Sequence, residues 1–339
     1  MKHPAVLFLD NTSADNLALA LAATRSSSFL DVKAIFITGR AAHTNTDASI
    51  EERDDVYSAE VQLGNAKRMA GFLRRAGRAV PVFLGEAVSR TKLRTVIPHK
   101  FHANEREQYD LRDDWSRTEI NGDFADGLDL LQRYQGDKLI VLVGGPLTEV
   151  AQIQCHTPEI AAKFGTMFIQ AGDFANDEST NLLGGKGNSF NGACDAEALH
   201  DVLYGHGSEI FILPSNMTKQ SELGFLTPED ISALKVWPEL VEVYRVHYER
   251  SAKRRGTSLY IHDLGLVMLA EQHIDAIRGY PYEWESVRII EAPYLAASAG
   301  ELEQRGTIVI EPAESSSRKV VVWQDTDRYR DRVATYLQS

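Results

Sequence analysis

The stretch AVLFLDNTSADNLALALAAT, residues 5–24, decides the fold of this chain. It opens with the apolar run Ala5–Leu9, which we interpret as a buried strand. Polar residues follow at once, from Asp10 to Asn16, and an apolar helical segment then covers Leu17–Thr24. A strand, a polar turn and a helix in this order predict the opening of an α/β protein.

Short apolar runs recur along the chain and alternate with segments of helical pattern. The further runs are Val32–Ile37, Val80–Leu84, Leu139–Val143, Met167–Ile169 and Ile210–Leu213. Amphipathic stretches such as Ala59–Arg75 and Ala196–Tyr204 lie between them. Continuous apolar strands separated by helices predict a mostly parallel sheet that helices cover on both faces.

Other segments depart from this alternation. The charged segment Thr91–Ile120 has little periodicity and predicts a long loop that could cover a site. Ser221–Gly256 has a helical pattern. Thr307–Ile310 and Lys319–Trp323 predict a hairpin, and a helix is expected from about Asp327. No repeat or linker is visible, so we expect one domain over residues 1–339.

Composition excludes several classes of protein. The 339 residues are 43% apolar and 25% charged, as in an ordinary globular enzyme. A net charge of −12 argues against a nucleic-acid partner and against binding to an anionic membrane. Cys155 and Cys194 form no CxxC pair, so no disulfide framework or zinc site is expected, and both are predicted to be buried. No targeting segment is apparent, which favours a cytoplasmic protein.

Polar residues stand directly after several predicted strands, where open α/β sheets bind ligands. The segment Asp10–Asn16 crowds carboxylates and amides at a strand-to-helix turn. Hard cations and ribose hydroxyls both favour such oxygen-rich turns. The same residues would also suit a helix N-cap with an acidic first turn.

Two further constellations leave similar alternatives open. The pair His262-Asp263 precedes an apolar helix over Leu264–Ala270, so it could supply an acid and a carboxylate, or a capping Asp beside a packed His. The Gly-rich segment Gly187–Asn191 contains Asn188 and Asn191, whose amides could bind sugar hydroxyls or simply form a turn.

The order of the motifs is more specific than any one of them. Along the chain stand the acidic strand end, GGPLTE (144–149), Phe-Asn-x-x-x-Asp (190–195), Leu-Pro-x-x-x-Thr (213–218) and His262-Asp263. This series resembles the inosine–uridine-preferring nucleoside hydrolase family from about Val6 to the last helix. The resemblance implies a nucleoside hydrolase-like, Rossmann-related fold and a small nucleoside-like ligand. It also implies a homodimer or a homotetramer.

In activity, the resemblance implies a hydrolase that cleaves the N-glycosidic bond of a ribonucleoside or modified nucleoside. Family members open with DxDPGxDD, whose carboxylates hold a calcium ion and activate a water. The resemblance assigns the catalytic base to Asp15 and the acid near the leaving group to His262. It assigns calcium ligation to Asn16, the carbonyl of Gly144 and Asp263, and to Asp10 if that residue matches the first family Asp. It assigns sugar binding to Asn191, and the residue pattern adds Asp10 and Asn188 as candidates for sugar binding.

This chain departs from the family pattern at residues that the resemblance aligns with metal-binding and sugar-binding positions. The Pro-Gly of the opening motif is absent, and Asn16 stands where the family has a carboxylate. A second family Asp falls on Asn11 or Thr12, and the family Glu before Asn191 is Ser189. Calcium affinity depends on ligand charge, so we expect calcium binding that is weakened or absent. The alternative function is a non-catalytic protein that binds a ribosyl ligand or acts as a scaffold.

Overall fold

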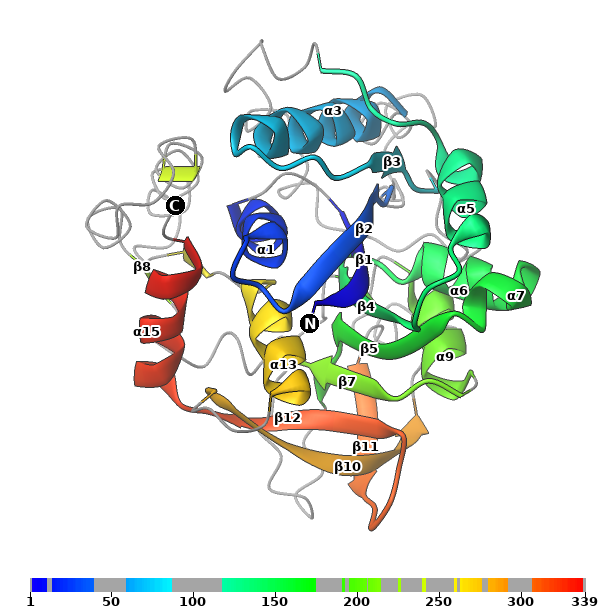
Figure 1. The fold of residues 1–339 in the computed structure, drawn as a ribbon. Helices are drawn as coiled ribbons and strands as arrows, with labels where there is room; N and C mark the ends of the chain where they lie inside the picture. Colours follow the sequence, from blue (N-terminus) through cyan, green and yellow to red (C-terminus); the bar gives the residue numbers. More distant parts are fainter. Residues whose placement is uncertain are drawn as a thin grey trace, which may run out of the picture.

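The computed structural model describes the chain in thirteen ranges: residues 2–10, 14–39, 59–86, 118–174, 191–192, 195–205, 207–214, 225–226, 240–241, 259–260, 263–275, 280–291 and 307–337. Within them, ten strands form one sheet in the order β3-β2-β1-β4-β5-β7-β12-β10-β11-β6 (Figure 1). The bounds of its first six strands are β1 His3–Leu9, β2 Leu30–Ile37, β3 Val82–Leu84, β4 Leu139–Gly144, β5 Phe164–Gln170 and β6 Asp173–Phe174. The other four are β7 Ile210–Leu213, β10 Tyr282–Glu291, β11 Thr307–Pro312 and β12 Arg318–Gln324.

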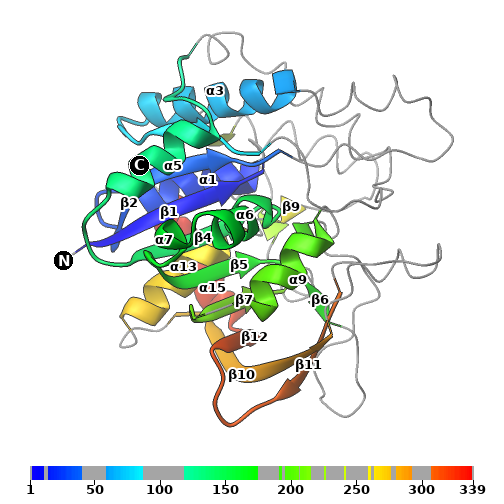
Figure 2. The same ribbon diagram turned by 90° about the vertical axis from the view of Figure 1, so that its right-hand side faces the viewer.

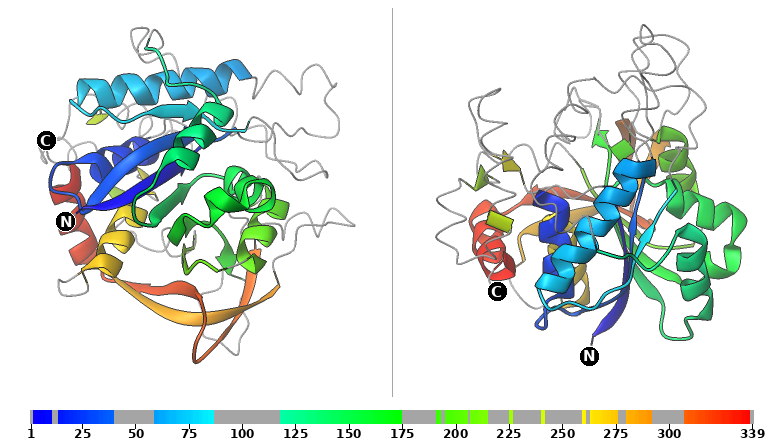
Figure 3. Two further views of the ribbon diagram at one scale, coloured as in Figure 1. Left: turned by 45° about the vertical axis from the view of Figure 1, so that its right-hand side comes forward. Right: turned by 90° about the horizontal axis from the view of Figure 1, so that it is seen from above.

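Helices cover both faces of this sheet, as the sequence predicts. One layer contains α1 (Ala14–Thr24), α3 (Ala59–Arg75), α13 (Leu264–Ile274) and α15 (Thr326–Leu337). The opposite layer contains α5 (Phe124–Arg133), α6 (Thr148–His156), α7 (Pro158–Ala161) and α9 (Ala196–Tyr204). Figure 2 shows α6, α7 and α9 together on their face, and the right-hand view of Figure 3 shows the two layers on either side of the sheet.

The alternation of side chains along β1 explains why two cores form. Ala5, Leu7 and Leu9 pack into the core beneath α1 and α13, whereas Val6 and Phe8 pack into the core beneath α6 and α9. Successive side chains of a strand point to opposite faces, so a strand that is apolar throughout requires cover on both sides. The register of β1 against β4 pairs Leu9 with Gly144 and brings the ends of these strands together.

The carboxyl-terminal strands correct one prediction. β11 and β12 are not a hairpin, because β10 lies between them and pairs antiparallel with both. The sequence YEWESVRIIE of β10 has no continuous apolar run, so the search for such runs overlooked it. β12 instead adds in parallel to β7 and extends the main sheet.

Two smaller predictions also fail. Phe225–Leu226, within the segment expected to be helical, form strand β8, which pairs with β9 (Leu259–Tyr260). Cys155 is exposed near the end of α6, whereas Cys194 lies outside the described residues.

The predicted loop Thr91–Ile120 lies outside the described residues except for positions 118–120. In the part of the chain that the structure describes, no helix combines the length and apolar character that crossing a membrane requires.

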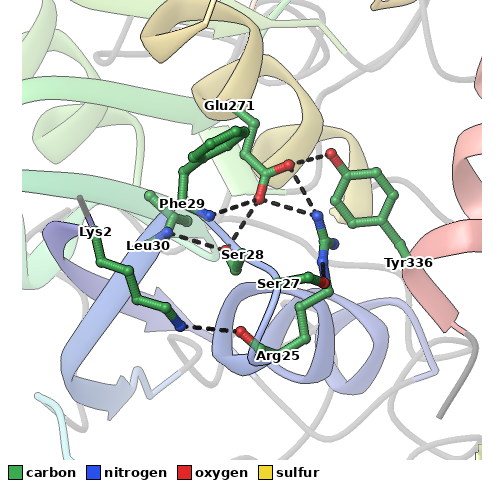
Figure 4. A network of polar contacts seen from close by, with 8 residues as sticks. All are labelled: Lys2, Arg25, Ser27, Ser28, Phe29, Leu30, Glu271 and Tyr336. Carbon is green, nitrogen blue, oxygen red and sulfur yellow. Dashed lines mark hydrogen bonds and ion pairs between the residues drawn. The ribbon is translucent and has the colours of Figure 1, made fainter.

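A buried carboxylate joins the first helix to the last two (Figure 4). Glu271 of α13 accepts hydrogen bonds from Arg25 Nη2 at 2.9 and 3.1 Å and from Ser28 Oγ at 3.0 Å. The hydroxyl of Tyr336, near the end of α15, donates to the same carboxylate, and the Arg25 guanidinium lies 3.5 Å from the centre of the Tyr336 ring. This network fixes α13 and α15 against α1.

We expect Glu271→Ala to destabilise the fold strongly, because it leaves the Arg25 guanidinium, whose side chain is only 13% exposed, without its counter-charge. Breaking one side of a buried ion pair costs about 3–5 kcal/mol. The exposed pair of Asp31 and Lys33 provides the control, since Asp31→Ala should cost less than about 1 kcal/mol. Thermal and urea unfolding followed by circular dichroism measure both variants. Equal losses would contradict a structural role for the Glu271 network.

Candidate active site

Four of the predicted site residues come together at the carboxyl ends of the central strands. Asp10 follows β1, Asn16 lies in the first turn of α1, and Asp263 directly precedes α13. Gly144 is the last residue of β4. All three polar side chains are buried, at 3%, 1% and 3% exposure respectively. Buried polar groups are costly unless they are hydrogen-bonded or serve a ligand, so this cluster is the first candidate for a site.

Two glycines allow these side chains to converge. A Cβ atom on Gly144 would lie 3.1 Å from Asn16 Oδ1 and 3.1 Å from Asp263 Cγ. A Cβ atom on Gly145 would lie 2.9 Å from both Cβ and the backbone nitrogen of Asp10. Any side chain at either position would push the polar groups apart. The pair Gly144-Gly145 therefore sets how closely the turn after β4 approaches the turn after β1.

Asn16 and Asp10 are joined directly. The Asn16 side-chain nitrogen donates to Asp10 Oδ1 at 2.7 Å. The neighbouring Asp15 is half-buried, and its Oδ1 accepts the backbone N–H of Asn16 at 3.0 Å. Asp15 therefore sits at the rim of the buried cluster, on the same helical turn.

The structure bears on the capping interpretation of Asp263. This residue occupies the N-cap position of α13, but its side chain makes no capping hydrogen bond within the described residues. Its carboxyl group instead approaches Gly144. The N-terminal end of a helix favours a negative charge, so α13 stabilises the Asp263 carboxylate although this side chain does not cap the helix.

One residue near the cluster was not predicted. Tyr329 of α15 is buried, and its ring centre lies 6.5 Å from that of Tyr282. Burial raises the pKa of Tyr329, and the negative charges of Asp263 and Asp15 raise it further. A tyrosine from the last helix thus borders the carboxylates of α1 and α13. No motif marks this residue in the sequence, because only the packing of α15 on α1 brings it there.

The two asparagines predicted to bind sugar have different outcomes. Asn191 is buried, and its side-chain nitrogen donates to the backbone oxygen of Gln170 at 3.0 Å and to Gln170 Oε1 at 2.7 Å. Gln170 ends β5, the strand beside β4, so Asn191 is held at the same edge of the sheet as Gly144. Asn188 lies outside the described residues, as does His262.

The Asp of the Phe-Asn-x-x-x-Asp motif is structural. Asp195 caps α9 by accepting the backbone N–H of Ala198 at 3.1 Å, and it also accepts the hydroxyl of Thr148 at 2.7 Å. Thr148 begins α6. The motif residue therefore ties the start of α9 to the start of α6, and this fixes the chain next to Asn191.

Known proteins of one family match this chain over nearly its whole length. The family model described as inosine-uridine preferring nucleoside hydrolase matches residues 6–331. This chain belongs to that family. No curated protein sequence matches it.

Solved nucleoside hydrolases have the same fold. A plant nucleoside hydrolase, PpNRh1, superposes with a TM-score of 0.66 at 19% identity over 100% of this chain and 98% of its own. An inosine-uridine preferring nucleoside hydrolase from Bacillus anthracis gives 0.64 at 15% identity, covering 100% and 99% of the two chains. A purine-preferring ribonucleoside hydrolase from Gardnerella vaginalis gives 0.65 at 16% identity, covering 98% of each.

In this member of the nucleoside hydrolase family, the residues at the predicted metal positions differ from the family pattern. Among the residues that the structure describes, no three Asp, Glu, His or Cys side chains are grouped so that they could hold a metal ion. At the position of a family carboxylate, the amide of Asn16 donates a hydrogen bond to Asp10. An N–H donor directed at a carboxylate oxygen occupies space that a cation between the two side chains would need. The described cluster therefore offers two carboxylates, of Asp10 and Asp263, and a neutral amide at Asn16.

A further buried carboxyl group belongs to the GGPLTE motif. Glu149 is fully buried and accepts hydrogen bonds from Thr38 Oγ1 at 2.9 Å and from the backbone N–H of Glu86 at 2.8 Å. Burial raises the pKa of Glu149 to about 8, although these hydrogen bonds lower it. Glu149 joins the ends of β2, β3 and β4. A Cβ atom on Gly85 would lie 2.2 Å from Glu149 Oε1, so the contact requires a glycine there.

We expect this group to make stability depend on pH. The pKa of Glu149 in the folded protein, about 8, lies above the ordinary 4.5, so the bound proton stabilises the fold fully below about pH 4.5. This contribution decreases as the pH rises and is lost once the pH has passed about 8. Each unit of pKa shift corresponds to about 1.4 kcal/mol.

Glu149→Gln imitates the protonated carboxyl group and should remove this dependence. We expect its melting temperature to exceed that of the wild type increasingly from pH 5 to pH 9. Glu159→Gln changes an exposed carboxylate at the start of α7 and is the control, with no such trend. If the melting temperatures of the wild type and Glu149→Gln instead changed in parallel from pH 5 to pH 9, Glu149 would not be the group that binds the proton.

Proposed function

We propose that this protein hydrolyses the N-glycosidic bond of a ribonucleoside or modified nucleoside and releases ribose and the free base. The observation that carries the proposal is the convergence of Asn16 and Asp263 on Gly144, and of Asp10 on Gly145, at the carboxyl edge of the sheet. Family membership supports the reaction class, and the buried acidic cluster supports this edge of the sheet as the location of the chemistry.

The proposed reaction needs a base and a negatively charged site. Asp15 accepts a proton from water as the water oxygen bonds to the anomeric carbon. The bond from that carbon to the nucleobase nitrogen breaks, and the departing nitrogen takes up a proton, for which His262 is the donor implied by the family resemblance. The carboxylates of Asp10 and Asp263 stabilise the positive charge that develops on the sugar.

Two described side chains suit recognition of the sugar. Asp10 offers a buried carboxylate oxygen, and Asn191 offers an amide held rigidly by Gln170. Hydroxyl groups of ribose donate to such acceptors. Asn188, from the same Gly-rich segment, completes the proposed set.

The same site suggests a second function: a ribosyl-ligand-binding protein without turnover. The hydrogen bond from Asn16 to Asp10 favours this candidate, because it replaces a family carboxylate with a neutral amide. Binding without release of ribose would identify this second function. We prefer the hydrolase to the non-catalytic binder because Asp15 is retained at the rim of the cluster. The family resemblance assigns the role of general base to this residue.

Asp15→Asn tests the assignment of the base. Removal of a general base should lower kcat by about 10²–10⁴-fold. The melting temperature should change little, because an asparagine keeps the oxygen that accepts the Asn16 N–H. Free ribose released from a panel of purine and pyrimidine nucleosides measures the activity, and Asp31→Asn, near the amino end of β2, is the matched control.

The possible results separate the two candidates. If Asp15→Asn kept most of the wild-type rate, the assignment of Asp15 as base would be wrong. If the wild type released no ribose but was stabilised against heat by nucleosides, the protein would be the non-catalytic binder.

We propose that calcium binds weakly or not at all, and a charge restoration at Asn16 tests this. Calcium sites span dissociation constants from about 10⁻⁹ to 10⁻³ M according to ligand charge and rigidity. We expect the wild type near the weak end and Asn16→Asp at least about tenfold tighter by titration calorimetry. Asn16→Ala removes the amide without adding charge and should not tighten binding. Calcium retained by the wild type after extensive chelation would contradict the proposal.

A further inference from the structure

Among the described residues, Gln170 holds the side chain of Asn191 in place. Two hydrogen bonds run from the side-chain nitrogen of Asn191 to Gln170, one to the backbone oxygen and one to Oε1. Both residues are 6% exposed. A primary amide has two N–H donors, so the two bonds use its donor capacity.

The orientation of this amide follows from elementary hydrogen bonding. A backbone carbonyl can only accept, so the group of Asn191 that faces the Gln170 oxygen must be the nitrogen. The carbonyl oxygen of the amide then points away from Gln170. What Asn191 can offer a ligand is therefore an acceptor and not a donor.

The position of Gln170 relates this amide to the acidic cluster. The register of β4 and β5 pairs Val143 with Ile169. The next residues, Gly144 and Gln170, are therefore neighbours at the ends of two adjacent strands. Gly144 borders Asn16 and Asp263. Asn191 is thus held one strand away from the cluster, on the edge where the ligand is proposed to bind.

We propose that Gln170 is a positioning residue, which turns the Asn191 amide so that its oxygen accepts a hydrogen bond from one hydroxyl of the ribosyl ligand. The inference deepens the proposed function and rests on it. It also gives the site a preference: a sugar that has lost this hydroxyl cannot donate and is bound less well.

Gln170→Met and Gln170→Glu test the role. Methionine is of similar length and cannot accept a normal hydrogen bond, so one of the two restraints on Asn191 is lost. Loss of a hydrogen bond worth about 0.5–1.5 kcal/mol weakens binding by about 2–12-fold. Glutamate keeps an acceptor at the same place and should stay within about twofold of the wild type.

Binding is measured without turnover. The probes are pseudouridine and formycin A, C-nucleosides whose base is joined by a carbon–carbon bond, and their 2′-deoxy and 3′-deoxy analogues. We expect the wild type to prefer the ribosyl form over one of the deoxy forms. In Gln170→Met that preference should shrink by about the same factor as the affinity. Thr166→Val, on the same strand β5 at its amino end, is the matched control and should leave the preference unchanged.

The outcomes distinguish this inference from the function on which it rests. If the wild type binds neither C-nucleoside, the nucleoside ligand and the role of Gln170 both fall. If the wild type binds them and Gln170→Met keeps the full preference for the hydroxyl, only the role of Gln170 is overturned. A lower melting temperature with unchanged preference would likewise make Gln170 a purely structural residue.

Discussion

The turn from β4 into α6 is the constraint on which the rest of the site depends. Its glycines let Asp10, Asn16 and Asp263 converge, its threonine holds Asp195, and its glutamate holds Thr38 and the chain at Glu86. Six consecutive residues therefore set the relative positions of β1, β2, β3, α9 and α13. Each contact needs a particular residue: no side chain at the glycines, a hydroxyl at Thr148 and a carboxyl at Glu149.

The buried carboxyl groups at this edge of the sheet are stabilised in different ways. Asp10 receives an amide N–H, Asp263 lies at the start of a helix, and Glu149 is held by donors and retains a proton. Three buried carboxyl groups would otherwise repel one another and resist burial. A neutral Asn16 among them lowers the local negative charge by one unit, which lessens the need for a cation as counter-charge.

Local patterns predicted much of this fold, and contacts between distant segments account for what they missed. Ala59–Arg75 and Ala196–Tyr204 were predicted with their observed bounds, because amphipathic periodicity is a property of the segment itself. β10 was missed, since a strand with few neighbouring apolar residues resembles a loop. Within the site, Asp10, Asn16 and Asp263 were found from their positions after strands or before helices. Gln170 and Tyr329 were not, because their roles depend on which segment packs against them.

The first helix has a consequence for how the protein is made. Leu17 to Ala23 are buried on all sides, and much of their cover comes from α13 and α15, which belong to the last quarter of the sequence. During synthesis this apolar helix leaves the ribosome long before its partners exist, and such exposed segments promote aggregation. In the nascent chain, the apolar surface of α1 therefore lacks this cover until α13 and α15 have been synthesised and Tyr336 can donate its hydrogen bond to Glu271. The native packing of α1 is therefore completed only after residues 264–337 have been synthesised.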